Sequence, residues 1–210
     1  SGKEIVYESS EGTATEIQYN TLMIPRGGEY TLLLADGTKV YLNSVTKLRY
    51  PVSFASHERR VYLSGEAYFE VAHDSLHPFI VETEGMSVRV YGTEFNVNTY
   101  NGGIIQTTLV NGKVGIRVPE TGEEVFLQPN EMAEFLNSFS SIRVKKVDTF
   151  VYTAWKDGKF VFENESIEEI MERLTRWYDI KVFFENESVK NQIFNLSLIH
   201  ISEPTRQAEI

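Results

Sequence analysis

The sequence predicts a mainly β protein: an antiparallel, jelly-roll-like β-sandwich followed by a small, truncated β-α-β domain. Short strand-like runs separated by turn residues follow one another from residue 20 to residue 147, at spacings of roughly 8–12 residues and without a helical period. Phe, Tyr and Trp make up 12% of the chain, and such side chains favour half-buried pleated surfaces. A helical period first appears after residue 147, which indicates a second domain.

Composition and charge exclude several classes of protein. Hydrophobic residues make up 41% of the 210 residues and charged residues 24%, which is typical of a folded chain and excludes wholesale disorder. The net charge of −10 disfavours a nucleic-acid partner. The absence of cysteine excludes disulfides, thiolate metal sites and cysteine nucleophiles. No window approaches the ~18 apolar residues that span a bilayer.

Three glycine-containing turns predict β-hairpins within residues 20–147. Asp36-Gly37 separates the runs 30–35 and 38–42, and the turn at residues 84–85 separates 79–83 from 86–91. Asn111-Gly112 likewise separates 106–110 from 113–118. Residues 61–71 form a longer run with an internal Gly65, and further strands are expected at 92–97, 125–127, 132–136 and 142–147.

The region from 148 to 195 predicts a second, smaller domain. A turn and a strand at 155–162 precede Ser166 and Glu169, which have the spacing of a helix capping box. One face of the helix that follows is apolar, with Ile167, Ile170, Met171, Leu174 and Trp177. Residues 180–184 are expected to form the second strand. Because such a unit is too small to bury its own apolar face, we expect it to pack against another surface.

The two ends of the sequence look different from the rest. Residues 1–19 are expected to form a flexible lead-in, and Ser1-Gly2-Lys3 resembles the scar of a cleaved tag. Residues 196–210 resemble the translation of a sequencing adapter, which would make them a non-native tail. Residues 196–201 alternate well enough to extend the run 193–195 as a strand. We expect dimers, where they form, to be built around residues 148–210.

Candidate chemistry is sparse. His73 and His77 lie four residues apart, but in a loop and without an evident third ligand, so no metal site is expected. Glu66 and Glu70 project from the same face of a strand and would suit glycosidase chemistry only if both lined one cleft. No nucleophile elbow, phosphate loop or dinucleotide fingerprint is present. We therefore expect no enzyme, no catalytic residue and no cofactor.

An ordered series of motifs resembles the periplasmic FecR domain of membrane-bound anti-sigma factors. The series runs through residues 25–30 (PRGGEY), 34–43 (LADGTKVYLN), 48–51 (LRYP), 60–71 (RVYLSGEAYFEV), 78–81 (PFIV), 90–97 (VYGTEFNV) and 108–114 (TLVNGKV). The resemblance covers about residues 20–147. Residues 148–195 are similar to the start of the small C-terminal domain that commonly follows, which is related to the short N-terminal domain of secretins and TonB-dependent receptors.

The resemblance implies a sensor that relays the state of an outer-membrane TonB-dependent transporter to a cytoplasmic extracytoplasmic-function sigma factor. It implies a periplasmic location and a tether to the inner membrane, with the tethering helix and the sigma-factor-binding segment outside this sequence. The expected partner is the signalling domain of the transporter. Independently, short mixed sheets expose unpaired backbone groups at which a partner strand adds. We expect the small domain to use an edge of its sheet or the outer face of its helix, and the contact candidates are Arg173, Arg176, Lys181 and Phe183.

The abundant tyrosines leave a second class of function open, a carbohydrate- or small-ligand-binding β-sandwich. Aromatic residues on exposed concave strands would favour that alternative, whereas the same residues buried between sheets would favour the sensor. The tyrosines in question are Tyr41, Tyr50, Tyr62, Tyr68, Tyr91 and Tyr100.

Overall fold

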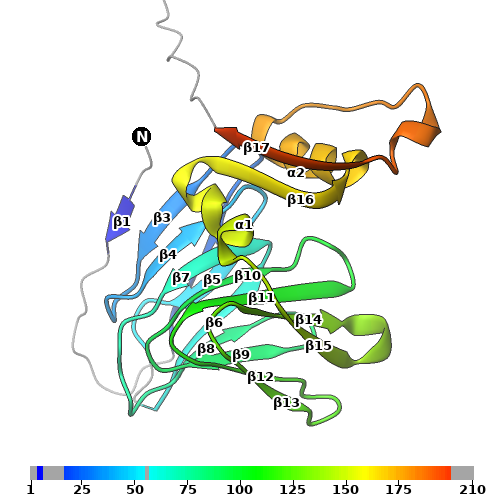
Figure 1. Cartoon of the computed structure of the whole chain (residues 1–210). Coiled ribbons are helices and arrows are strands. Elements are labelled where there is room, and N and C mark those ends of the chain that lie inside the picture. Colours follow the sequence, from blue (N-terminus) through cyan, green and yellow to red (C-terminus); the bar gives the residue numbers. More distant parts are fainter. Residues whose placement is uncertain (1–3, 7–16, 55–56, 200–210) are drawn as a thin grey trace, which may run out of the picture.

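The computed structural model of the chain describes residues 4–6, 17–54 and 57–199. Within these residues two large sheets face each other as a β-sandwich, as the sequence predicts (Figure 1). The first sheet has eight strands in the spatial order β1 (Glu4–Val6), β3 (Tyr30–Leu33), β4 (Lys39–Leu42), β7 (Glu66–Glu70), β10 (Glu94–Asn98), β11 (Ile104–Asn111), β14 (Glu131–Leu136) and β15 (Ser141–Lys146). The second has seven, in the order β13 (Glu124–Leu127), β12 (Val114–Arg117), β9 (Ser87–Val90), β8 (Phe79–Glu82), β6 (Arg59–Ser64), β5 (Lys47–Pro51) and β2 (Tyr19–Met23).

Neighbouring strands are antiparallel, apart from the parallel pairs β1–β3 and β6–β8. Three residues of the expected lead-in, Glu4–Val6, form β1 and therefore differ from that expectation, while residues 1–3 and 7–16 lie outside the described residues. Part of the predicted strand 142–147 forms the edge strand β15.

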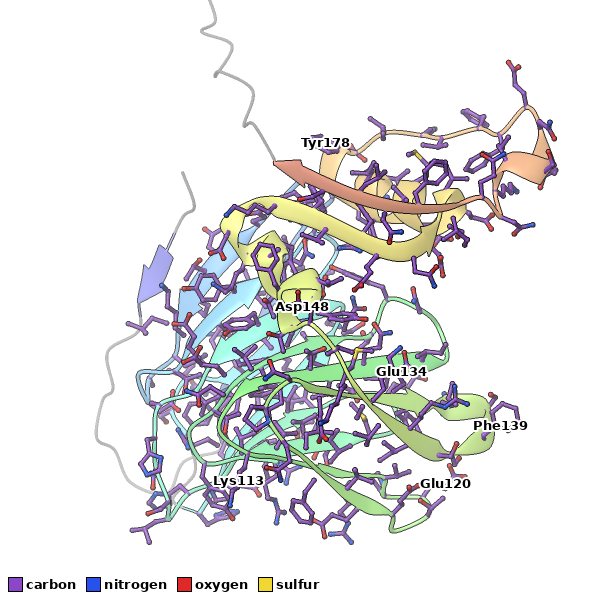
Figure 2. All side chains as sticks on the ribbon, viewed as in Figure 1. Lys113, Glu120, Glu134, Phe139, Asp148 and Tyr178 are labelled. Atoms are coloured by element: carbon purple, nitrogen blue, oxygen red, sulfur yellow. The ribbon has the colours of Figure 1, made fainter. Side chains whose placement is uncertain are left out.

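Alternate residues of each strand point into the space between the two sheets, where side chains from both sheets meet (Figure 2). Phe69 of β7 and Phe95 of β10 stack in this core with their ring centroids 5.1 Å apart, and both are fully buried. Burying each such ring contributes about 1.5–3 kcal/mol to folding. Apolar residues therefore recur at every second position of these strands because those positions face the core.

Two of the three predicted hairpins are confirmed. The turn at Gly37, with φ +83°, joins β3 to β4, and the turn at Gly85 joins β8 to β9. The hairpin predicted at Asn111-Gly112 is wrong, because β11 belongs to the first sheet and β12 to the second. Gly112 is needed there for a close approach: a Cβ would lie 2.8 Å from Oγ1 of Thr93.

The run expected as one strand at 61–71 is two strands in different sheets. Gly65 has φ +113° and separates β6 from β7. A Cβ at this position would lie 2.5 Å from Oγ1 and 2.7 Å from Cα of Thr46. The glycine thus turns the chain sharply from the second sheet to the first. The strand that follows, β7, carries outward-facing side chains of the candidate site.

The chain after residue 147 lies on the outer face of the first sheet (Figure 1). It contains α1 (Thr149–Thr153), the 3-10 turn η2 (Ala154–Asp157), β16 (Lys159–Ser166), α2 (Ile167–Tyr178), η3 (Glu187–Val189) and β17 (Ile193–Ile199). A further 3-10 turn, η1 (Asn137–Phe139), joins β14 to β15. We call residues 159–199 the C-terminal unit. No helix of the described residues is both long and apolar enough to cross a membrane.

The helix of the C-terminal unit forms as predicted. The Ser166 hydroxyl accepts a hydrogen bond from the amide of Glu169, and the Glu169 side chain accepts one from the amide of Ser166, which completes the capping box. Of the predicted apolar face, Ile170 and Trp177 are buried. Met171 and Leu174 pack partly buried against the same cluster.

The strand predicted at residues 180–184 is wrong. The second strand of the unit is β17, which pairs antiparallel with β16 in a two-stranded sheet. Because β17 provides the hydrogen-bonding partner of β16, residues 180–184 are outside the sheet, and Phe183 is 84% exposed. Residues 196–199, part of the expected tail, belong to β17, while residues 200–210 lie outside the described residues.

Candidate functional site

The outer face of the first sheet carries polar and aromatic side chains where the C-terminal unit covers it. Strand alternation sends Phe69 and Phe95 inward, and it therefore sends Glu66, Tyr68 and Asn96 outward. Glu66 is only 7% exposed. Its carboxylate accepts hydrogen bonds from Nδ2 of Asn43 at 2.7 Å and from Nδ2 of Asn96 at 3.0 Å. These two amides offset the cost of burying a charged group.

Trp155 connects this polar face to the chain that covers it. The η2 turn inserts the indole, which is 4% exposed, and its Nε1 donates a hydrogen bond to Oδ1 of Asn96 at 3.2 Å. Asn43, Glu66, Asn96 and Trp155 thus form one continuous chain of hydrogen bonds, which we call the polar network. Each member is buried, so each depends on its neighbour for a partner.

An apolar cluster lies beside the polar network. Phe160 of β16 meets Trp177 of α2 edge to face, with ring centroids 4.5 Å apart. Tyr68 of the first sheet and Trp155 belong to the same buried cluster. The C-terminal unit therefore completes its small core with side chains of the sandwich, which is how a unit of this size buries its apolar face.

The end of α2 is held by the loop between β2 and β3. The amide of Gly27 donates a hydrogen bond to the carbonyl of Arg176 at 2.8 Å, and Nη1 of Arg26 donates one to the carbonyl of Thr175 at 3.2 Å. The guanidinium of Arg176 lies over the ring of Tyr100, 4.3 Å from its centroid. These contacts satisfy carbonyl groups that the last turn of a helix leaves without intrahelical partners.

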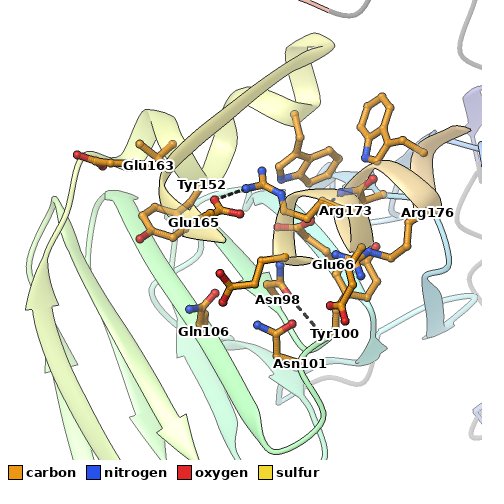
Figure 3. Close-up of a pocket in the computed structure, with 16 residues that line it drawn as sticks. Glu66, Asn98, Tyr100, Asn101, Gln106, Tyr152, Glu163, Glu165, Arg173 and Arg176 are labelled. Carbon is orange, nitrogen blue, oxygen red and sulfur yellow. Dashed lines mark hydrogen bonds and ion pairs between the residues drawn. The ribbon is translucent and has the colours of Figure 1, made fainter. Parts of the chain in front are cut away.

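A cleft of about 170 Å³ lies between the first sheet and the C-terminal unit (Figure 3). Its aromatic and amide lining comprises Tyr100, Tyr152, Trp155, Trp177, Asn43, Asn98, Asn101 and Gln106. Its charged lining comprises Glu66, Glu163, Glu165, Glu169, Glu172, Arg173 and Arg176. The carboxylates outnumber the guanidinium groups, so the cleft carries negative charge.

Arg173 is engaged inside the protein. Its Nη1 lies 2.5 Å from Oε1 of Glu165 and donates a second hydrogen bond to the carbonyl of Val161 at 3.2 Å. Its guanidinium also lies over the ring of Phe162. Burial raises the pKa of Glu165, and the charge of Arg173 opposes that rise. The arginine therefore holds β16 and α2 together.

The four predicted contact residues fall into two groups. Arg173 and Arg176 line the cleft and contact groups of their own chain. Lys181 and Phe183 lie in the segment after α2, where Phe183 is 84% exposed. The cleft does not bring the two groups together.

The other candidate pairs are separated or engaged locally. Glu66 lines the cleft, whereas Glu70 lines a different hollow with His73 and Glu94, so the two carboxylates do not share one cleft. Nδ1 of His77 lies 2.7 Å from Oδ2 of Asp74. The described residues contain no group of three or more acidic or histidine side chains suited to a metal ion.

Tyr50 belongs to the core between the two sheets, whereas Tyr68 belongs to the cluster beneath the C-terminal unit. Tyr50 and Tyr68 are buried, at 3% and 2% exposed, whereas Tyr91 is 43% exposed. Tyr41 packs edge to face on Tyr68, beneath the C-terminal unit. Packing beneath the C-terminal unit therefore accounts for Tyr41 and Tyr68, the two of these tyrosines on strands of the first sheet.

Sequence reasoning missed Trp155 and Asn96 as members of a site, and it named Tyr100 only among the tyrosines of the ligand-binding alternative. Asn96 did carry a local signal, since an amide between the two core residues Phe95 and Val97 must face outward on a strand. Oδ1 of Asn43 accepts a hydrogen bond from the amide of Ser44 at 2.7 Å, which is a local contact. No local signal pairs it with Glu66, because 23 residues separate the two.

Comparisons with known proteins agree with this architecture. The family model described as FecR protein matches residues 20–115, and the model described as FecR, C-terminal matches residues 159–204. The second match extends beyond residue 196, where the non-native tail was expected to begin. No curated protein matches the chain.

Solved structures match over most of the chain. Two crystal structures, at 1.65 and 2.50 Å resolution, of a candidate anti-sigma factor from Parabacteroides distasonis ATCC 8503 are each 31% identical to this chain, with a TM-score of 0.79. Each match covers 88% of this chain and 86% of the other. With both family models in the expected order, this likeness shows that the chain belongs to the FecR family.

Proposed function

We propose that the chain is the periplasmic sensor region of an anti-sigma factor, without enzymatic activity. It relays the state of an outer-membrane TonB-dependent transporter to an extracytoplasmic-function sigma factor. Membership of the FecR family and the likeness to a candidate anti-sigma factor support the signalling role. We place the sigma-factor contact and the tether to the inner membrane outside residues 1–210.

One observation carries the proposal: the C-terminal unit docks on the sandwich and still exposes large apolar side chains. Phe183, Ile193 and Phe194 are 84%, 55% and 36% exposed. Exposed apolar residues grouped on one small unit are typical of a protein-binding surface. The signalling domain of the transporter is the proposed occupant.

The docking contacts offer a route for the signal. A partner that pulls or rotates α2 acts on Arg176. The carbonyl of this residue accepts a hydrogen bond from the amide of Gly27, and its guanidinium lies over the ring of Tyr100. The same movement strains the hydrogen bond from Trp155 to Asn96. Partner binding at the C-terminal unit is thereby coupled to the sandwich, because these contacts form only when the unit is docked.

We place the partner contact at Lys181 and Phe183 and at the edge of the β16–β17 sheet. Sheet edges offer backbone groups to an added strand. Arg173 and Arg176 come into contact with the partner only when the cleft opens, because both are engaged inside it.

A titration of the signalling domain of the transporter encoded beside this gene tests the proposal, with isothermal calorimetry as the readout. We expect binding that Phe183→Ser weakens by about tenfold, which corresponds to 1.4 kcal/mol. Phe139→Ser is the matched control, since Phe139 is 76% exposed but lies on η1, far from the C-terminal unit. Absence of binding at high micromolar concentration, or equal loss in both variants, contradicts the proposal.

The composition of the cleft favours a second candidate function, the binding of a carbohydrate or small ligand. Aromatic rings and amides line the cleft together, as in many sites that recognise polar ligands. Trp155 and Trp177 both border it, so a bound sugar should change tryptophan fluorescence. A saturable change with simple hexoses, lost in Asn98→Ala, would support this alternative over the sensor.

A further inference from the structure

The outer face of the second sheet is basic, although the whole chain carries a net charge of −10. Alternation along these strands sends their apolar residues into the core and their polar residues outward. The outward residues include five basic side chains, which we call the basic face: Lys47, Arg49, Arg60, Arg89 and Arg117. This face lies on the side of the sandwich opposite to the C-terminal unit.

Four of the five basic side chains are not neutralised by an ion pair within the described residues. Arg60 is the exception, because it pairs with both Glu58 and Glu82. Lys47, Arg89 and Arg117 are exposed. Arg49 is also exposed, and its guanidinium lies 3.9 Å from the ring centroid of Tyr19 and 5.1 Å from that of Tyr62.

The two tyrosines hold Arg49 in place. A guanidinium stacked on aromatic rings keeps its in-plane N–H groups directed outward and available to an acceptor. Tyr62 and Arg49 also line a hollow of about 380 Å³ together with Lys47 and Ser64, and the carboxylates Glu82 and Glu84 border its other side. The basic face therefore combines an oriented donor with space for the group that would accept from it.

The free basic side chains form two pairs at a defined spacing. Lys47 and Arg49 lie on β5, while Arg89 and Arg117 lie on the neighbouring strands β9 and β12. Four strand intervals separate Arg49 from Arg117, which is about 19 Å at ~4.8 Å per strand. Six residues of extended polypeptide span about the same distance.

An exposed aromatic ring flanks the second pair. Phe126 of β13 is 66% exposed and lies against Gly115, where a Cβ would be 3.2 Å from Cε1 of the ring. Gly115 is in turn the neighbour of Arg89 in the ladder. The face thus offers apolar contact area beside its charges, as protein-binding surfaces do.

We propose that the basic face binds an acidic polypeptide segment of a partner protein. Charge complementarity supports the acidic character of the partner, and the spacing of the two basic pairs supports an extended segment. The face also contains Glu82 and Glu124, and a uniformly anionic lipid surface would repel these two carboxylates. A polypeptide can place its own basic or neutral residues opposite them.

Fluorescence anisotropy with the full chain tests the proposal. The probe is a labelled peptide of about 12 residues in which Glu and Tyr alternate, roughly twice the span of the two pairs. We expect saturable binding that weakens as salt is raised, because exposed charges are screened. Replacing both Arg89 and Arg117 by Glu should weaken it by about tenfold or more.

The matched control is Arg143→Glu with Lys146→Glu on the edge strand β15, which changes the net charge by the same amount elsewhere. It should leave affinity within about threefold of the parent. Arg49→Gln, which keeps a polar side chain between the tyrosines, should also weaken binding. Circular dichroism of each variant separates loss of binding from loss of folding.

Three outcomes overturn the proposal. They are an equal loss in the control, no binding at about 1 mM peptide, and binding to anionic phosphatidylglycerol vesicles but not to the peptide. None of these outcomes bears on the transporter contact, because the two surfaces lie on opposite sides of the sandwich and are tested with different probes.

Discussion

The indole nitrogen of Trp155 donates a hydrogen bond to the side-chain oxygen of Asn96, a residue 59 positions earlier in the sequence. Asn96 lies in the middle of the first sheet and uses its amide nitrogen to bind Glu66. A single asparagine therefore joins a buried carboxylate of the sandwich to the chain that covers it. The position of the C-terminal part is specified by a polar contact as well as by apolar packing.

Trp155→Phe should destabilise the protein by about 1–3 kcal/mol. The phenyl ring fills most of the indole volume, so the loss reflects mainly the buried oxygen of Asn96 left without a donor. Urea unfolding followed by circular dichroism measures the change. Tyr91→Phe, at an exposed position, is the control and should lie within ~0.5 kcal/mol of the parent. Equal stability of the two variants would show that the hydrogen bond contributes nothing.

Gly65→Ala should cost more than Gly103→Ala. Both glycines have positive φ, +113° and +107°, so both substitutions bring similar backbone strain, on the order of 1 kcal/mol. Only at Gly65 would the new Cβ meet another residue, at 2.5 Å from Oγ1 of Thr46, whereas nothing lies within 4 Å at Gly103. The difference between the two variants in thermal unfolding isolates the clash, which we expect to exceed ~2 kcal/mol. A difference near zero would mean that the turn relaxes to admit a methyl group.

The sequence predicts the sandwich well because its strands obey one local rule. Alternation fixes which residues face the core, and the glycine turns at Gly37 and Gly85 join strands that are neighbours in a sheet. The same rule fails at Asn111-Gly112, where the positive φ of Gly112 serves a crossing between sheets. Local turn chemistry fixes a reversal of the chain, but the sheet that receives the next strand depends on distant partners.

The candidate site was less predictable for the same reason. Nothing near Trp155 in the sequence indicates Asn96, and nothing near Arg176 indicates Gly27 or Tyr100. The sequence predicts Arg173 and Arg176 as contact residues on the outer face of the helix. The helix instead presents them to the cleft, because Ile170 and Trp177 must face the apolar cluster beside it. Helical periodicity gives the relative positions of side chains, whereas the surface that covers them determines which are accessible.

The hydrogen-bonded contact between Asp74 and His77 predicts a pH dependence. The hydrogen bond with His77 and the amide of Leu76 lower the pKa of Asp74 to about 2. A carboxyl whose pKa is lower in the folded state stabilises the fold above its unfolded pKa of about 3.8, and this contribution is lost as pH falls through about 2. Asp74→Asn should therefore be less stable than the parent at pH 5, and the gap should close towards pH 2. If the difference in unfolding free energy between the parent and Asp74→Asn does not change with pH, the ionisation of Asp74 is not coupled to folding.

Ending the chain at residue 195 instead of 199 should undo the C-terminal unit. Residues 196–199 pair with 159–162 of β16, and their removal deletes four of the cross-strand pairs that hold β17. At about 1 kcal/mol for each hydrogen bond lost, the unit should lose several kcal/mol of local stability. Hydrogen exchange of the amides of Phe160 and Phe162 should accelerate strongly. The amides of Phe95 and Leu109 in the first sheet serve as the internal control and should remain protected.

The same pair of chains tests whether residues 196–199 also build dimers. Apolar residues of β17 such as Ile193 and Leu196 remain partly exposed at 55% and 39%, and an edge strand with such side chains is prone to pair with a second copy. Light scattering should therefore show more association for the chain ending at 199 than for the chain ending at 195. If the shorter chain associates as strongly, residues 196–199 are not the dimer edge. If its β16 amides stay protected, these residues are not what stabilises the unit.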